Sequence, residues 1–239
     1  MRMRRKKNLL PRLEACGAWQ VREPQTLRGN WRSLYPDARA LWIEIGCGKG
    51  SFTVETARQN PQVLLVAVER VADAMVMAME KAREADVRNV FFINADAARL
   101  GECFAPGEAD RIFLNFSDPW PSKRHCRRRL THFSFLMSYR QVLREGGEIH
   151  LKTDNRPLFD WSMTQFPAAG YEVGEVTHDL HANGPVGVMT DYEAKFAAEG
   201  VPINRCVAVA RPLTGEPVMP EDLSLIPFGY AEGTKYGRI

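Results

Sequence analysis

From residue 41 onward, short apolar runs alternate with longer segments in which apolar residues recur at helical spacing. The apolar runs predict strands at residues 41–45, 63–68, 90–93, 111–115, 148–152, 171–177 and 205–210. The intervening segments predict helices at residues 51–59, 71–85, 130–144, 157–166 and 191–199. Strands that alternate with helices form a mostly parallel sheet with helices on both faces, so the pattern predicts an α/β, doubly wound fold.

The two ends of the chain do not share this alternation. Residues 1–40 are basic and carry turn formers, which predicts a flexible N-terminal arm leading into a domain at residues 41–210. Residues 211–239 contain four prolines and four glycines with little periodicity, and they predict an irregular, poorly ordered C-terminal tail. Within the domain, residues 181–189 have the glycine and proline content of a mobile loop.

The composition is typical of a soluble globular protein. The 239 residues can bury a substantial core, and the contents of 45% hydrophobic and 26% charged residues are ordinary. The longest apolar run, residues 63–68, is far too short to cross a bilayer, which argues against a membrane protein. No apolar segment of a secretory signal follows the basic start, and the five cysteines lack the spacing of a zinc or redox site. We therefore expect a cytoplasmic protein with reduced thiols.

Positive charge is concentrated in two places, although the net charge is only +3. One cluster lies at the N-terminus and the other at residues 123–129. Locally concentrated positive charge binds polyanions, because binding releases condensed counterions. A run of like charges is often only a solvated surface, but the second cluster directly follows a predicted strand end, which favours a role in binding phosphates.

A glycine-rich turn follows the first predicted strand, with Glu44 before it and glycines at 46, 48 and 50. Glycines at alternate positions allow the backbone to approach a ligand closely. The spacing departs from both the dinucleotide-binding fingerprint and the P-loop. A pyrophosphate would also face the carboxylate of Glu44, whereas a ligand with a cationic centre would be attracted to it.

Further acidic residues follow the next three strands. Glu69 closes the second strand and could accept hydrogen bonds from both hydroxyls of a ribose. Asp96 follows the third strand and could bind an adenine amino group, and Asp118 follows the fourth. S-adenosylmethionine carries a sulfonium, an ammonium, a ribose and an adenine, so it fits this row of carboxylates. The alternative is a glycine turn with ordinary surface acids.

The segment after the fourth strand reads Asp118-Pro-Trp-Pro and continues into the basic run. The two prolines stiffen the backbone and fix Asp118 and Trp120 relative to the strand. An aromatic ring beside a carboxylate can form the wall of a base pocket, and arginines can clamp phosphates with forked hydrogen bonds. The segment therefore indicates nucleic-acid binding next to the carboxylate row.

Over residues 41–210 the chain resembles the bacterial tRNA (guanine-N7-)-methyltransferases. The resemblance rests on residues 115–129, on His-Leu-Lys-Thr-Asp-Asn at 150–155, on Thr-Asp-Tyr-Glu-x-Lys-Phe at 190–196 and on the glycine turn. The Asp-Pro-Trp-Pro block with its basic run is highly specific, whereas the glycine turn is shared by many methyltransferases. One departure is Ser122, where many relatives carry lysine; Lys123 follows immediately and is the candidate to replace it.

The resemblance implies a Rossmann-like methyltransferase fold with seven strands, the last antiparallel. It implies methyl transfer from S-adenosylmethionine to N7 of a guanine in tRNA, with Asp118 at the reaction centre. The implied cofactor-binding residues are Glu44, Gly46, Gly48, Glu69, Asp96 and Asp118. The implied substrate-binding residues are Lys123, Asp154, Thr190, Asp191, Tyr192 and Glu193, and those that would contact RNA are Arg124, His125, Arg127, Arg128 and Arg129.

Structural alternatives exist for two of these motifs. Residues 152–155 could be a capped strand-to-helix turn, and Thr190 with Glu193 has the spacing of a capping box. Such roles are compatible with ligand binding at the same helix start. The histidines show no metal-ligand spacing, so no metal is expected, and a monomer and a homodimer remain equally open. The rival functions are a methyltransferase of this fold acting on another RNA or a small molecule, and a non-catalytic RNA-binding relic.

Overall fold

The computed structural model describes residues 8–225, which form one seven-stranded sheet in the order β3-β2-β1-β4-β5-β7-β6. The strands are β1 (Ala40–Ile45), β2 (Val63–Val68), β3 (Val90–Ile93), β4 (Ala109–Asn115), β5 (Leu143–Thr153), β6 (Tyr171–Thr177) and β7 (Asn204–Ala210). The first five pair in parallel, and β7 is antiparallel to both β5 and β6. The predicted fold class and the antiparallel last strand are confirmed.

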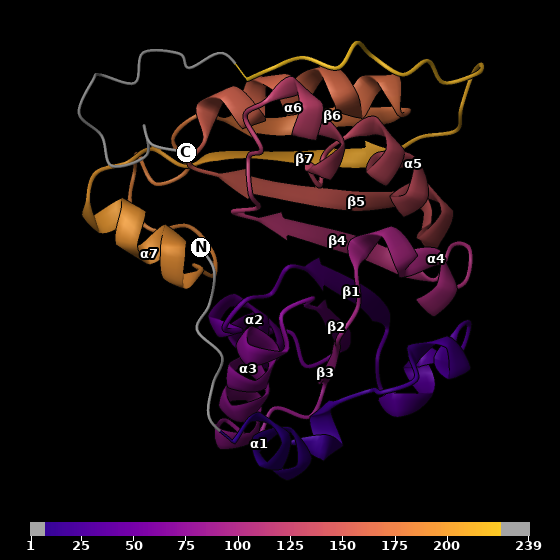
Figure 1. Cartoon of the computed structure of the whole chain (residues 1–239), viewed down its shortest axis with the longest axis vertical. Helices are drawn as coiled ribbons and strands as arrows, with labels where there is room; N and C mark the ends of the chain where they lie inside the picture. The colour runs from indigo at the N-terminus through magenta and orange to yellow at the C-terminus, as the bar shows by residue number, and fades with distance from the viewer. Residues whose placement is uncertain (1–7, 226–239) are drawn as a thin grey trace.

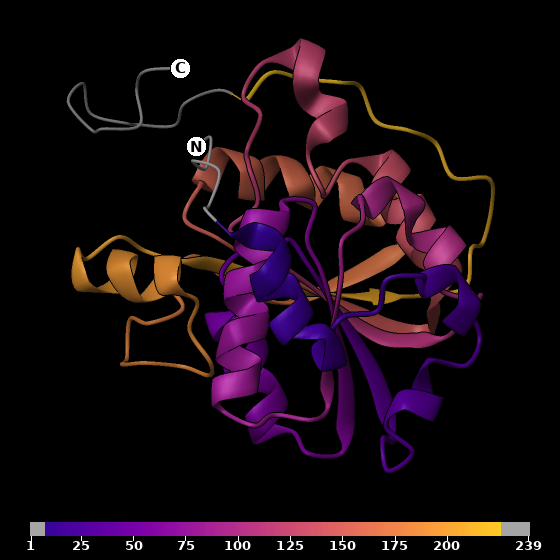
Figure 2. The ribbon, with the colours of Figure 1, turned by 60° about the horizontal axis from the view of Figure 1, so that its bottom comes forward.

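Helices cover both faces of the sheet (Figures 1 and 2). They are α1 (Leu9–Ala15), α2 (Ser51–Gln59), α3 (Ala72–Glu84), α4 (Leu100–Cys103), α5 (Phe133–Val142), α6 (Arg156–Ala168) and α7 (Asp191–Ala198). Helices α2 and α3 pack against β2 and β3, while α5 and α6 pack on the other face against β5 and β6. In Figure 1, α7 lies at the end of the sheet toward which the arrowheads of β4 and β5 point.

The central strands are apolar because both of their faces are covered. All six residues of β2 are buried, as expected for a strand of a parallel sheet between two helical layers. The predicted strands match the observed ones closely, except that β5 begins five residues before the predicted start, at Leu143. Its pairing with β4 is irregular at this end, where the register shifts between Ala109 and Arg111.

Residues 8–40 are packed against the domain, so the prediction of a flexible arm is wrong for this part of the chain. Trp31 is fully buried and stacks on Phe104 with the ring centroids 5.0 Å apart, and its Nε1 donates to the carbonyl oxygen of Cys103 at 2.8 Å. Trp19 is also buried and donates to the carbonyl oxygen of Val87 at 2.7 Å. Residues 1–7, which hold most of the N-terminal charge cluster, lie outside the described residues.

Residues 211–225 contain no helix or strand, as expected for the tail. In Figures 1 and 2 this yellow segment runs back on the α6 side of the molecule. Its last residue, Leu225, is buried in a cluster with Leu158 and Trp161 of α6. The prediction of poor order is therefore wrong for the end of this segment, while residues 226–239 lie outside the part that the structure describes.

Between residues 8 and 225, no helix has both the length and the apolar composition needed to cross a bilayer.

We expect Trp31→Ala to lower the free energy of unfolding by about 3–5 kcal/mol, because it removes a buried ring and a buried hydrogen bond. Urea denaturation followed by circular dichroism measures this loss. The matched control is Leu10→Ala, since Leu10 is 72% exposed in the same N-terminal segment and its replacement should cost less than about 0.5 kcal/mol. Equal stabilities of the two variants would contradict the packing of this segment on the core.

Candidate functional site

The carboxyl ends of the five parallel strands meet at one edge of the sheet and bring acidic residues together there. Read across the sheet from β3 to β5, these residues are Asp96, Glu69, Glu44, Asp118 and Asp154. The register supports this order, because Ile45 pairs with Val68 on one side and with Leu114 on the other. The four carboxylates of the predicted row thus follow neighbouring strands, and Asp154 extends this row at the end of β5.

The glycine turn after β1 is held by the acidic end of β2. The backbone N–H of Gly48 donates to Oε2 of Glu69 at 2.9 Å, and that of Val71 donates to Oε1 at 2.8 Å. Gly46 and Gly48 both have a positive φ, and a Cβ added at either would meet no described protein atom within 4 Å. These two glycines therefore leave one side of the turn open for a ligand to approach the backbone.

Gly50 serves packing instead. A Cβ at this position would lie 2.4 Å from the Cβ of Ala78, so glycine is required for the close contact between the start of α2 and α3. Its φ of +77° also favours glycine.

Glu44 lies under the glycine turn and is only 2% exposed. Oγ1 of Thr53 donates to one of its carboxylate oxygens and Nδ2 of Asn115 donates to the other. Burial raises the pKa of Glu44 to about 7, although these two hydrogen bonds act in the opposite direction. A positive charge bound at this edge would favour the ionised form of Glu44.

Asp118 is exposed at the end of β4, in a loop of residues 116–121 that we call the Asp118 loop. On either side of it the backbone is unusual, because Phe116 has a φ of +51° and Trp120 a φ of +43°. Bulky residues rarely occupy the left-handed region, so the surrounding structure must stabilise this conformation. The backbone of the Asp118 loop thus contains an unfavourable conformation on either side of Asp118.

Arg129 provides much of that stabilisation, which corrects its predicted role. The residue is fully buried, and its guanidinium donates to the carbonyl oxygens of Pro119, Trp120 and Pro121 and of Leu223 in the tail. The same group lies over the ring of Trp161, 4.3 Å from its centroid. The prediction that Arg129 contacts RNA is therefore wrong, because its donors are used within the protein.

Four cationic residues of the basic run do face solvent. Residues Lys123–Arg128 form a 3-10 helix, η5, in which Lys123, Arg124, Arg127 and Arg128 are exposed. His125 packs edge-on against Trp120, and the guanidinium of Arg128 lies 4.9 Å from the centroid of the Trp120 ring. Basic charge therefore begins directly beside the Asp118 loop. Ser122, which precedes η5, is exposed and makes no side-chain cap.

Glu193 is also less available to a substrate than predicted, because it is fully buried. It closes the predicted capping box with Thr190, which the structure confirms. Its two carboxylate oxygens also accept hydrogen bonds from Nζ of Lys152 at 2.9 and 3.1 Å, and Oε1 lies 3.0 Å from Nε2 of His181. Direct contact between Glu193 and a target nucleoside is therefore not supported, and its visible role is to join α7 to β5.

Lys152, for which the sequence predicts no role, forms a buried ion pair with Glu193. A buried ion pair of this kind is costly to break, because removing one partner leaves an uncompensated charge. The motif at residues 150–155 contained the lysine, but nothing in the sequence indicated that its partner lies 41 residues later.

Two further residues of the α7 motif, Asp191 and Tyr192, are open to solvent. Asp191 is exposed and lies 3.6 Å from Nζ of Lys81, and Tyr192 is 59% exposed. The ring of Tyr192 stacks on Phe196, which in turn stacks on Phe116 of the Asp118 loop. Aromatic contacts thus connect α7 to this loop.

Asp154 is half-buried at the end of β5, and burial raises its pKa above the usual range. The neighbouring Asn155 caps α6, since its side chain accepts from the N–H of Leu158 at 2.8 Å. The alternative of a capped strand-to-helix turn is therefore confirmed for this motif, but the expectation that Asp154 caps the helix is wrong, because Asn155 is the capping residue. Asp154 is thus left for another role.

Three potential metal ligands, Cys126, His132 and Asp222, lie within 4.8 Å of one another. The N–H of Ser134 donates to Nδ1 of His132, so the ring proton is on Nε2, which faces Asp222 at 3.1 Å. A cation bound at Nε2 would require loss of that proton. Hydrogen bonding therefore accounts for the cluster without an ion.

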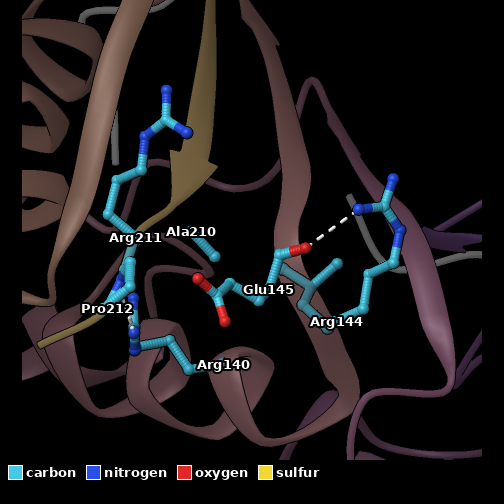
Figure 3. Close-up of a pocket in the computed structure, with 7 residues that line it drawn as sticks. Arg140, Arg144, Glu145, Ala210, Arg211 and Pro212 are labelled. Atoms are coloured by element: carbon cyan, nitrogen blue, oxygen red, sulfur yellow. Dashed lines mark hydrogen bonds between the residues drawn. The ribbon is translucent and has the colours of Figure 1, made fainter.

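A hollow of about 170 Å³ lies at the opposite edge of the sheet, between the start of β5 and the end of β7 (Figure 3). Its arginines are committed to the protein: Arg140 donates to the carbonyl oxygens of Gly170 and Arg211, and Arg144 to Asp110 and the carbonyl oxygen of Glu145. This hollow belongs to the framework and not to the carboxylate row.

Known proteins of similar sequence are methyltransferases. Residues 38–206 match a family model described as "Putative methyltransferase". The tRNA (guanine-N(7)-)-methyltransferase of Geobacillus kaustophilus is 43% identical over 213 residues, which cover 89% of this chain and 98% of the relative. The enzyme of the same name from Bacillus licheniformis is 46% identical over 189 residues, covering 79% of this chain and 89% of the relative.

The chain belongs to the tRNA (guanine-N7-)-methyltransferase family. The resemblance stated from its motifs is thereby confirmed. A solved structure with the same fold is the 16S rRNA methyltransferase KamB, with a TM-score of 0.62, 16% identity and coverage of 77% of this chain and 94% of that one. At this identity the likeness supports the methyltransferase fold alone.

We expect the free energy of unfolding of this methyltransferase to fall as pH rises from about 4.5 to 7, because folding raises the pKa of Glu44 to about 7. Above this range the folded protein carries a buried ionised carboxylate, whereas below it Glu44 is protonated in both states. This decline in the free energy of unfolding should be about 3 kcal/mol, and it should be absent in Glu44→Gln.

Urea denaturation at pH 5 and pH 8 measures this difference. The control is Glu145→Gln, because the exposed Glu145 side chain stays hydrated in the folded protein. If wild type and Glu44→Gln show the same change between the two pH values, the buried carboxylate has no such effect.

Proposed function

We propose that this family member transfers the methyl group of S-adenosylmethionine to N7 of a guanine in tRNA, forming 7-methylguanosine. The observation that carries the proposal is the position of Asp118. It is exposed at the end of β4, next to the glycine turn after β1, and the basic helix η5 continues from its loop. Asp118 thus lies between the glycine turn, where the cofactor would bind, and η5, where RNA phosphates would bind.

The cofactor fits the edge formed by β1, β2 and β3. The open side of Gly46 and Gly48 suits the methionine part, and the negative charge around Glu44 suits its ammonium and sulfonium. Glu69 is oriented by two backbone N–H groups and would receive the ribose hydroxyls. Asp96, which also caps the turn at Ala98, would bind the adenine amino group.

Guanine N7 has a free lone pair and no proton, so the reaction requires no general base. The protein has to place N7 in line with the methyl carbon, and such positioning lowers the barrier by several kcal/mol. Methylation moves positive charge onto the purine. Asp118, or the half-buried Asp154, can stabilise this charge and bind the N1 and N2 hydrogens of the base.

The target nucleoside would lie between the Asp118 loop and the start of α7. Asp154, Thr190, Asp191 and Tyr192 border this region, and the Lys152–Glu193 ion pair holds α7 in place. Lys123 would take the place of the lysine that relatives carry at Ser122. N7 is often masked in folded RNA, so the guanine would swing out of its stack to reach the site.

The surrounding RNA backbone would be bound by η5, through Lys123, Arg124, His125, Arg127 and Arg128. Because the proposed substrate is tRNA, we place the enzyme in the cytoplasm.

We expect the wild-type protein to transfer labelled methyl groups to unmodified bulk tRNA, with nucleoside mass spectrometry identifying 7-methylguanosine. Asp118→Asn should lower kcat by about 100-fold or more, because it removes the charge that stabilises the methylated purine. Calorimetry should show that the variant still binds S-adenosylmethionine. Asp86→Asn, at an exposed position after α3, is the matched control.

Near-normal turnover by Asp118→Asn would refute its role. If the wild-type protein labels another nucleoside, the proposed substrate is wrong. If the wild-type protein does not bind S-adenosylmethionine, the result favours the non-catalytic relic.

We expect Arg127→Gln and Arg128→Gln each to weaken tRNA binding and to reduce the slope of log affinity against log salt by about one, since each removes one phosphate contact. Filter binding at several salt concentrations measures the slope. Arg58→Gln, an exposed charge change on α2, is the control. A slope unchanged by both variants would exclude η5 from the RNA interface.

A further inference from the structure

Arg129 joins the Asp118 loop to the C-terminal segment. Its Nε and Nη2 donate to carbonyl oxygens of the loop, and its Nη1 donates to the carbonyl oxygen of Leu223 at 3.0 Å. A buried guanidinium with unpaired N–H groups is unstable, so the loop and the tail together determine the position of this side chain.

Residues 221–225, which we call the C-terminal strap, also contact the loop and η5 directly. The N–H of Leu225 donates to the carbonyl oxygen of Pro121 at 2.9 Å. The N–H of Lys123 donates to Oγ of Ser224 at 3.0 Å. The strap therefore binds the backbone on both sides of Ser122, directly after the Asp-Pro-Trp-Pro block.

Two side chains attach the strap to the domain. Leu225 is 9% exposed and packs against Leu158 and Trp161 of α6. Asp222 lies 3.1 Å from Nε2 of His132, the buried residue that caps α5. With an apolar contact at one end and a partly buried hydrogen bond near the other, the strap has a defined place on the domain.

The strap matters for the site because of the conformation of Trp120. Its φ of +43° is unfavourable for a bulky residue, and its carbonyl oxygen accepts from both Nε and Nη2 of Arg129, at 3.1 and 2.9 Å. Asp118 lies two residues earlier on the same short loop. If Arg129 shifted, the loop would relax and the carboxylate of Asp118 would change direction.

We propose that the C-terminal strap is a positioning element for methyl transfer, which holds Asp118 and Trp120 in place through Arg129 and Pro121. The proposal rests on the proposed function. The strap lies beyond residues 38–206, the part of the chain that matches the family model, so the motifs of the family do not include it.

Two truncated chains test the strap: the longer one keeps it and the shorter one lacks it. A chain ending at Leu225 lacks residues 226–239 only, and a chain ending at Pro220 lacks the strap as well. At saturating tRNA and S-adenosylmethionine, the longer chain should keep kcat within about twofold of wild type. The shorter chain should lose about tenfold or more in kcat, because the reacting groups are misplaced. Its Kd for S-adenosylmethionine should stay within about twofold, since the glycine turn is not contacted by the strap.

A point variant keeps the test independent of chain length. Arg129→Lys retains the positive charge but lacks the forked guanidinium, so it cannot bond all four carbonyl oxygens. It should reproduce the pattern of lower kcat with unchanged cofactor binding, while circular dichroism confirms that it is folded. Val218→Ala, at a 76% exposed position before the strap, is the control and should behave as wild type.

Equal kcat values for the two truncated chains would overturn the proposal. It would also be overturned if loss of the strap tightened tRNA binding at unchanged kcat. In that case the role of the strap would be to neutralise positive charge on η5, because Glu221 lies 3.5 Å from Lys123 and Asp222 lies 3.5 Å from Arg127. A wild-type protein that methylates no guanine would refute the proposed function itself, whereas an active wild type with equal truncations would refute the strap alone.

Discussion

The parallel order of five strands is the constraint on which the site depends, because it brings five carboxyl ends to one edge. Acidic residues that are far apart in the sequence, from Glu44 to Asp154, become neighbours there. The sheet topology brings them together, and no single sequence motif contains them all. Such an edge attracts positive charge, while η5, which begins directly beyond Asp118, attracts negative charge. In the proposed function, these adjoining surfaces of opposite sign recognise a cationic small molecule and a polyanion, with Asp118 at the boundary between them.

Buried ionic groups then fix the parts that border this boundary. Lys152 and Glu193 attach α7 to the last parallel strand, and Arg129 attaches the Asp118 loop to α6 and the tail. Both are charged side chains inside the protein, where their hydrogen bonds have to be complete to be tolerated. The groups at the boundary can be exposed because these interior contacts hold the backbone beneath them.

The sequence was sufficient to predict features that depend on local pattern. Apolar runs such as the one in β2 mark buried strands, the position of each acidic residue after a strand follows from topology, and the spacing of Thr190 and Glu193 gives the capping box. The fold, the carboxylate row and the family can therefore be inferred from the sequence alone.

Features that depend on distant partners could not be predicted in this way. Arg128 and Arg129 are identical and adjacent, yet one is exposed and the other fully buried, because the carbonyl oxygen of Leu223 and the ring of Trp161 come from far along the chain. The structure of the N-terminal segment also differs from the predicted flexible arm, for a related reason. Its basic composition suggested a solvated arm, whereas burial of Trp31 against Phe104 determines its structure.

The hydrogen bond between Arg129 and Leu223 affects the order in which parts of the protein can fold during synthesis. It spans 94 residues and involves one of the last described residues of the chain. During synthesis the sheet can begin to form as its strands emerge in order, but the Asp118 loop lacks one of its supports until the ribosome has released residue 223. A nascent chain can therefore form its sheet before the Asp118 loop has all of its supports, and a product interrupted before residue 223 would have the fold while this loop lacked one of its hydrogen-bonded contacts.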